Sequence, residues 1–234
     1  MKHWILALSL ATLLGCASAG SSGPNNSEDG SNSAGTSGRR LLVFRLSVNP
    51  NATVDRSGQG YYIILLNANG QAIEATDLDT FTDFIRFDGT NFDWFHRQAN
   101  QPNPGFNFVQ VGSLNSAATI SPDGKTIEVV LDIGESTNFL NQFIVGNTFT
   151  AHALTSDNFQ GGLIGRLIDT LGQGPNINSN SAQTITVRKG DGAITPLPQS
   201  YPIDPINDFV TQGGLPVNFP TLNFDIARFE VVAI

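Results

Sequence analysis

The chain has 234 residues, of which 20 are acidic and 12 basic, so its formal net charge is −8. This charge argues against nucleic acid as a partner, because phosphates require a basic surface, and against electrostatic adhesion to anionic lipids. The single cysteine, Cys16, lies near the N-terminus, which excludes disulfides, thiolate metal sites and a cysteine nucleophile from the rest of the chain. Only 14% of the residues are charged, and glycine and phenylalanine are abundant, which favours strands and turns over helices.

Residues 1–15 have the three parts of a secretory signal peptide. Lys2 supplies the positive start, and an uncharged apolar run from Trp4 to Leu14 follows it. The run is shorter than the roughly 20 residues that a transmembrane helix needs. We therefore expect residues 1–15 to be a signal peptide that is removed from the mature protein.

The end of this segment, Leu13-Leu14-Gly15-Cys16, resembles the lipobox of bacterial lipoproteins. The resemblance implies cleavage before Cys16, attachment of a diacylglycerol to its sulfur and, in many members, acylation of the new amino group. Gram-negative members with Asp after the cysteine stay in the inner membrane, so Ala17 implies the outer membrane if the organism has one. The alternative is an ordinary secretory signal that happens to contain a cysteine.

Residues 16–38 are predicted to form the lipidated cysteine and a flexible tether. The segment is rich in serine, glycine and asparagine and has no large apolar residue, so it cannot repay the entropy of ordering. A chain of this kind has an end-to-end distance of roughly 25 Å. The tether would let residues 39–234 stand off from the membrane that the lipid enters.

From residue 39 onward, short apolar runs alternate with turn signals, which predicts one antiparallel β-sandwich of about 8–10 strands. We expect strands at 41–48, 61–66, 84–87, 92–96, 106–111, 125–132, 148–154, 183–188 and 222–234. Turn residues at 88–91 and 121–125 predict a hairpin and a tight turn. Apolar residues at helical spacing predict one short helix over 163–171, ended by Gly172.

An aromatic strand is the main candidate for a binding site. Phe92, Trp94 and His96 should share one face of it, with Asp93, Phe95 and Arg97 on the other. Exposed Trp and Tyr rings can stack on sugars while polar neighbours bind hydroxyl groups. The candidate ligand-binding residues are therefore Trp94, His96, Tyr61, Tyr62 and Arg97. The alternative is that Trp94 fills the core of the sandwich, in which case the stacking platform is lost.

The Tyr61-Tyr62 pair and the turn Ser121-Pro122-Asp123-Gly124-Lys125 before an alternating strand resemble extracytoplasmic β-sandwich binding domains. Family-9-type carbohydrate-binding modules and DOMON domains are examples, and the resemblance implies sugar or haem as a ligand. Haem bound through Met and His does not fit, because Met1 is the only methionine. His96 with His152 is the remaining pair of haem ligands.

Signals for metal binding and catalysis are few. Asp77, Asp79 and Asp83 offer oxygen ligands for Ca²⁺, but without a calcium-loop motif we expect a solvated acidic loop and no metal. No nucleophile elbow, zinc-protease motif or phosphate loop occurs. The leading hypothesis is a non-catalytic, lipid-anchored binding module for a carbohydrate or envelope protein, without a cofactor. The alternatives are an assembly lipoprotein with no small-molecule site and a hydrolase with an unfamiliar site.

Overall fold

The computed structural model describes residues 41–75, 77–98, 108–132, 148–160, 163–172, 185–189, 194–196, 204, 206–209, 215–216 and 218–233. All of them belong to one compact unit, Ser37–Ile234. The predicted signal peptide, Cys16 and the tether lie outside the described residues. Within the described ranges, no helix has the length and apolar character needed to span a bilayer.

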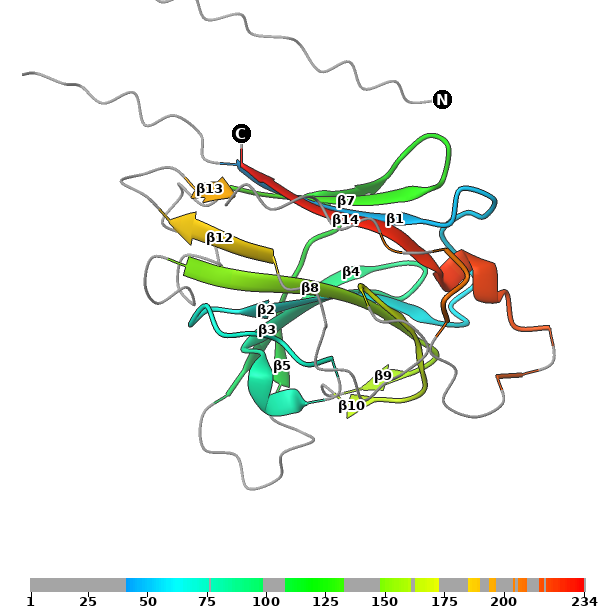
Figure 1. Ribbon diagram of the computed structural model, residues 1–234, viewed down its shortest axis with the longest axis horizontal. Coiled ribbons are helices and arrows are strands. Elements are labelled where there is room, and N and C mark those ends of the chain that lie inside the picture. The colour runs from blue at the N-terminus through cyan, green and yellow to red at the C-terminus, as the bar shows by residue number, and fades with distance from the viewer. Residues whose placement is uncertain are drawn as a thin grey trace, which may run out of the picture. The chain divides into compact units, whose positions relative to one another are not determined.

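The chain folds into two main antiparallel sheets, which makes it an all-β sandwich (Figure 1). The smaller sheet has the order β14-β1-β7-β6, with strands β1 (Leu41–Val48), β6 (Ala118–Ile120), β7 (Thr126–Asp132) and β14 (Ile226–Ala233). The larger sheet has the order β13-β12-β8-β2-β3-β4-β5, with β11 also beside β8. Its strands are β2 (Tyr61–Asn67), β3 (Asp83–Phe87), β4 (Phe92–Arg97), β5 (Phe108–Ser113), β8 (Thr148–Ser156), β11 (Leu167–Thr170), β12 (Ile185–Lys189) and β13 (Ile194–Pro196).

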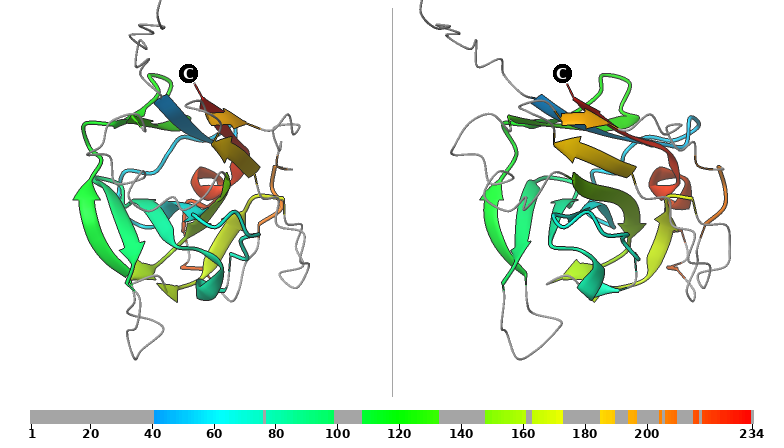
Figure 2. Two further views of the ribbon diagram at one scale, coloured as in Figure 1. Left: turned by 90° about the vertical axis from the view of Figure 1, so that its left-hand side faces the viewer. Right: turned by 60° about the vertical axis from the view of Figure 1, so that its left-hand side comes forward.

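The larger sheet curves, and its β12–β13 end lies beside β14 of the smaller sheet (Figure 2). A separate hairpin pairs β9 (Phe159–Gln160) with β10 (Leu163–Ile164). Two short 3-10 helices, η1 (Leu78–Thr80) and η3 (Thr221–Phe224), precede β3 and β14. The last described strand, β14, pairs with the first strand, β1, along almost its whole length.

The main hydrophobic core lies between the two sheets and follows the period-two pattern of the sequence. Ile127, Val129 and Leu131 of β7 all point into it, as predicted. A second cluster covers the other face of the larger sheet and includes Ile63 and Leu65 of β2. The apolar residues on both faces of β2 are thus explained, because the strand is covered on two sides.

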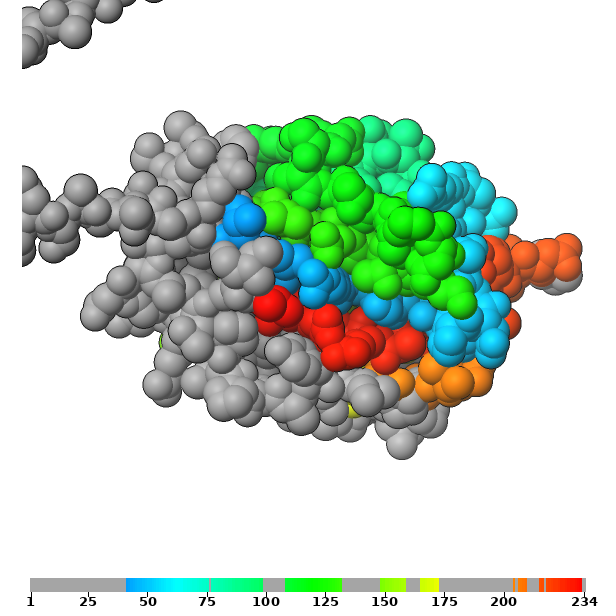
Figure 3. Space-filling view, turned by 90° about the horizontal axis from the view of Figure 1, so that it is seen from above, coloured from blue at the N-terminus to red at the C-terminus, as the bar shows by residue number. Residues whose placement is uncertain are grey.

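The outer face of the smaller sheet carries charged side chains in register across its strands. Figure 3 shows β14, β1 and β7 side by side on this face. Arg45 of β1 lies 2.7 Å from Glu128 of β7 and 3.9 Å from Glu230 of β14, measured between nitrogen and oxygen atoms. Cross-strand ion pairs of this kind are typical of a sheet face in contact with water.

The predicted turns are confirmed in atomic detail. In the β3–β4 hairpin, the Asp88 carboxylate accepts hydrogen bonds from the backbone of Thr90 and Asn91, and Gly89 has a φ of 92°. In the turn before β7, Gly124 has a φ of 73° and donates its N–H to the Ser121 carbonyl at 2.8 Å. Glycine is favoured at both positions because it adopts positive φ without a steric penalty.

Two predictions about secondary structure are wrong. Residues 163–171 contain strands β10 and β11 and no helix. Leu167 and Ile168 of β11 belong to opposite hydrophobic clusters, so apolar spacing that resembles a helix reflects a strand buried on both faces. The final strand begins at Ile226 and not at Leu222, which lies in η3 and is 43% exposed.

Phe229 tests how much the last strand contributes to the core. Its side chain is fully buried opposite Leu46 of β1. Phe229→Ala should lower the free energy of unfolding by about 3–5 kcal/mol, through lost burial and the cavity left behind. Leu222→Ala, at an exposed position, should change it by less than about 1 kcal/mol. Urea unfolding followed by circular dichroism measures both, and equal effects would contradict the assignment of Phe229 to the core.

Candidate functional site

Trp94 lies in the core between the sheets. Its side chain is fully buried, and its indole Nε1 donates a hydrogen bond to Asp83 Oδ1 at 3.1 Å. No face of the indole is therefore exposed for a sugar ring to stack on. The alternative weighed from the sequence, a tryptophan that fills the core, describes this residue.

The polar atoms around Trp94 form a local network centred on Asp83. His96 Nδ1 lies 2.8 Å from Asp83 Oδ1, and the Thr82 hydroxyl donates to Oδ2 at 2.7 Å. The Asp83 side chain is buried, so these bonds replace the water it loses. His96 is thus placed as a partner of a buried carboxylate.

The other predicted ligand-binding residues do not converge on one surface. Tyr62 is buried, donates to the Asn223 carbonyl at 2.8 Å and has a pKa raised by burial far above its usual value. Tyr61 packs on the opposite face of the sheet, with the Arg86 guanidinium 5.4 Å from its ring centroid. Arg97 pairs with the Asp79 carboxylate. The five residues therefore do not build one binding platform.

The three predicted Ca²⁺ candidates are also separated by their partners. Asp77 accepts a hydrogen bond from the Asp79 backbone N–H at the start of η1. Asp79 pairs with Arg97, and Asp83 lies in the core with His96. They do not form a group that could share one ion.

His96 and His152 cannot ligate one haem. Strands β4 and β8, which carry them, are separated by β3 and β2 in the larger sheet. His152 lies opposite Leu65 on the face covered by the second cluster, whereas His96 bonds to Asp83 on the face of Trp94. His152 is fully buried, and its Nε2 lies 2.7 Å from the Thr170 hydroxyl.

A pocket of about 470 Å³ opens at a place the sequence did not indicate. Its lining residues come from the segment before β2, the segments flanking β9 and β10, and the segment before η3: Gln59, Asp157, Arg166, Pro216, Asn218 and Phe219. Asp157 and Arg166 form an ion pair at 2.5 Å, and the Arg166 backbone N–H donates to Asp157 Oδ1 at 2.7 Å. The Phe219 ring packs on Phe224, with centroids 5.0 Å apart.

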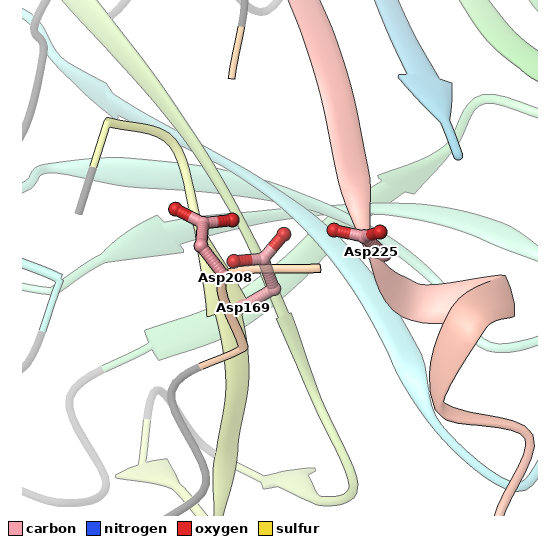
Figure 4. A group of neighbouring side chains, drawn as sticks. All are labelled: Asp169, Asp208 and Asp225. Atoms are coloured by element: carbon pink, nitrogen blue, oxygen red, sulfur yellow. The ribbon is translucent and has the colours of Figure 1, made fainter. Parts of the chain in front are cut away.

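A buried acidic cluster is the most unusual electrostatic feature of the described residues. Asp169 comes from β11, Asp225 from the residue before β14, and Asp208 from the segment 206–209. Figure 4 shows their carboxylates pointing toward one another, and one oxygen from each lies within 4.8 Å of the others. Asp169 and Asp225 are fully buried.

Backbone and amide donors hold part of this cluster in place. Asp169 accepts the N–H of Ile226 at 2.6 Å and that of Thr170 at 2.8 Å. Asp225 Oδ2 accepts from Asn49 Nδ2 at 2.6 Å and from the Asn207 N–H at 2.9 Å. These bonds join β11, the start of β14 and the end of β1.

Four buried carboxylate oxygens in and beside the cluster accept no hydrogen bond. They are Oδ1 of Asp225, both oxygens of Asp208 and Oδ2 of Asp204, a buried neighbour whose Oδ1 accepts the Gly172 N–H at 2.6 Å. Burial and the neighbouring carboxylates raise the pKa of Asp169 to about 7 and that of Asp204 to about 8. Burial and Asp225 also raise the pKa of Asp208.

Sequence reasoning missed these four aspartates for identifiable reasons. Asp169 fell in the predicted helix and Asp225 in the predicted last strand, while Asp204 and Asp208 lay in or beside a proline-rich segment. The one available signal was Asp169 itself, a charged residue inside the apolar run Leu167–Leu171. Comparisons with known protein families, curated proteins and solved structures found no match, so the site rests on its geometry alone.

The raised pKa of Asp204 predicts that the protein loses stability as pH rises. The measurement is made in chelator so that no metal ion competes with the proton for the carboxylate. An unfolded aspartate titrates near about 3.9, and the folded one near about 8. Between these values only the folded state binds the proton, so the free energy of unfolding falls as pH rises. Asp204→Asn does not titrate, and its stability relative to the wild type should therefore be higher at pH 8 than at pH 5.

Urea unfolding of both proteins in chelator at the two pH values measures this difference. Glu74→Gln, which removes an exposed carboxylate, is the matched control and should show no such change. A difference between the wild type and Asp204→Asn that is the same at both pH values would contradict the prediction.

Proposed function

We propose that this protein is a lipoprotein of the cell envelope, facing outside the cytoplasm, whose β-sandwich binds a ligand without catalysing a reaction. The pocket between Gln59, Arg166 and Phe219 is the observation that carries the binding proposal. A carbohydrate or another hydroxyl-rich envelope component is the ligand class that its lining favours.

The anchor is supported by the sequence of the first residues. The motif Leu13-Leu14-Gly15-Cys16 resembles the lipobox, and the serine- and glycine-rich segment that follows suits a tether. Each buried methylene group of an acyl chain contributes about 0.8 kcal/mol, so two or three chains hold a protein on a membrane stably where one does not. Outer-membrane placement follows if the organism is Gram-negative.

The lining of the pocket favours an uncharged polar ligand. The charges of Asp157 and Arg166 offset each other, which removes a preference for either sign of charge. The amides of Gln59 and Asn218 can each donate and accept hydrogen bonds, as hydroxyl groups require. Phe219 adds an apolar ring on which a sugar C–H face can pack.

The geometry gives less support to a hydrolase. Three aspartates with raised pKa would be natural acid–base groups, but Asp169 is fully inaccessible and Asp204 is 1% exposed. The third, Asp208, is half-buried, and both of its carboxylate oxygens are inaccessible. A substrate cannot approach them in this conformation. In the pocket, the acidic residue Asp157 is engaged by Arg166.

The anchor predicts that Cys16 is the site of lipid attachment. In cells fed a labelled palmitate analogue, the wild-type protein should become labelled. Only detergent should release it from the membrane fraction. Cys16→Ser has no thiol to accept the diacylglyceryl group and should take up no label. A labelled Cys16→Ser protein, or a mature wild-type protein with an unmodified N-terminal residue by mass spectrometry, would refute the anchor.

The pocket predicts binding to a glycan array. The purified protein should bind at least one class of envelope or environmental glycan. Asn218→Gly should weaken that binding about tenfold, because it removes one hydrogen-bonding amide while glycine keeps the positive φ of 78° at this position. Gln71→Ala, at an exposed site outside the pocket, should bind as the wild type does. Absence of binding to every glycan would favour the assembly lipoprotein instead.

A further inference from the structure

We propose that Asp169, Asp208 and Asp225 bind one Ca²⁺ ion that joins β11, the segment 206–209 and the start of β14. This site goes beyond ligand binding in the pocket, because it concerns different residues and a different class of ligand. Three features of the cluster support the site: carboxylate oxygens that accept no hydrogen bond, the spacing of the three side chains and the chemistry of the donor set.

Several buried carboxylate oxygens in the cluster accept no hydrogen bond. Asp225 is fully buried, and its Oδ2 accepts two hydrogen bonds while its Oδ1 accepts none. Both oxygens of Asp208 are buried and accept none. A buried carboxylate oxygen without a partner is costly, because it has lost its water and gained nothing in exchange. A cation bound between these oxygens removes that cost.

The charged groups around the cluster are negative. Among the described residues, the charged groups that act on Asp169 are the carboxylates of Asp208 and Asp225, and those that act on Asp204 are the same two with Asp169. Within the described part of the chain, the ion pairs given by the structure involve none of these aspartates. A divalent cation offsets most of the charge of three carboxylates.

The carboxylate oxygens are close enough to share one ion. One oxygen from each of the three aspartates lies within 4.8 Å of the others. Calcium–oxygen distances of about 2.3–2.6 Å allow ligands on opposite sides of Ca²⁺ to lie about 4.6–5.2 Å apart. Magnesium–oxygen distances of about 2.0–2.1 Å allow at most about 4.2 Å. Separations of up to 4.8 Å therefore fall within the span of Ca²⁺, and any above about 4.2 Å would exceed that of Mg²⁺.

The donor set also separates Ca²⁺ from other metals. All three ligands are carboxylates, and the cluster contains no histidine or cysteine, which Zn²⁺ prefers in structural sites. Mg²⁺ usually retains several waters, which a buried site accommodates poorly, whereas Ca²⁺ accepts six to eight oxygens in irregular arrangements. Backbone carbonyl groups and water would complete its coordination.

The position of the site gives the ion a structural role. Two of the three ligands, Asp208 and Asp225, bracket a stretch that contains three pocket residues, Pro216, Asn218 and Phe219. An ion that fixes both ends of this stretch would hold one wall of the pocket. Calcium should therefore stabilise the fold and favour the arrangement in which the pocket is formed.

The experiment uses the full chain, purified in mild detergent and freed of metal with a chelator. Titration calorimetry should show one Ca²⁺ bound per chain. The thermal midpoint should rise by about 5–10 °C at a Ca²⁺ concentration one hundredfold above the dissociation constant. Mg²⁺ at the same concentration should produce a clearly smaller shift.

Asp208→Asn is the informative variant. Neither Asp208 oxygen accepts a hydrogen bond from another residue, so the substitution removes a charge without breaking such a bond. In chelator, the thermal midpoint of Asp208→Asn should equal or exceed that of the wild type, because repulsion within the cluster is relieved. Addition of Ca²⁺ should no longer raise its thermal midpoint. The control Glu74→Gln removes an exposed carboxylate and should retain the full shift.

Three outcomes would overturn the proposal. The first is a wild-type protein that neither binds Ca²⁺ stoichiometrically nor becomes more stable with it, which would mean that shared protons neutralise the cluster. The second is an Asp208→Asn protein that keeps the full shift, and the third is an equal shift with Mg²⁺. Glycan binding is measured separately, so failure of the calcium site and failure of the binding function remain distinguishable.

Discussion

The start of β14 is held by carboxylates, and the closure of the smaller sheet depends on this point. Asp169 of β11 accepts the backbone N–H of Ile226, while the Asp225 carboxylate and carbonyl accept the side-chain and backbone N–H groups of Asn49. Two sheets and the end of β1 therefore meet at buried negative charge. Hydrogen bonds to a charged acceptor are stronger than neutral ones, but carboxylates gathered in a dry interior repel one another. Among the described residues, this junction is thus both a fixed point of the fold and a concentration of electrostatic cost.

Much of the fold could be predicted from local patterns, because neighbouring residues determine them. Alternation in β7, the two-sided apolar run of β2 and the glycine turns before β4 and β7 each follow from a few consecutive side chains. The helix predicted over 163–171 failed because a strand buried on both faces loses the alternation that identifies it. The role of Trp94 could not be decided from its own strand, since its burial depends on the second sheet and on Asp83.

The candidate sites were beyond prediction for a different reason. The pocket draws on four separated segments, and the acidic cluster draws on residues as far apart as Asp169 and Asp225. Sequence spacing carries no information about such encounters, which are determined by how the strands are connected. What the sequence does indicate is the setting: a lipobox-like motif and a long polar segment before an all-β unit with few charges. The mixed polar and aromatic pocket is lined by none of the buried aspartates, and it supports the proposal of a binding module in that setting.

The pairing of β1 with β14 also bears on when the protein can fold. Asn49 and Asp225 are bonded across 176 residues of sequence, so the smaller sheet cannot close until nearly the whole unit has been made. Contacts this distant along the chain form slowly, because a long loop must be closed before they contribute any favourable energy. In the export that we propose, the chain would cross the membrane N-terminus first, and this delay would keep the polypeptide unfolded until translocation is almost complete.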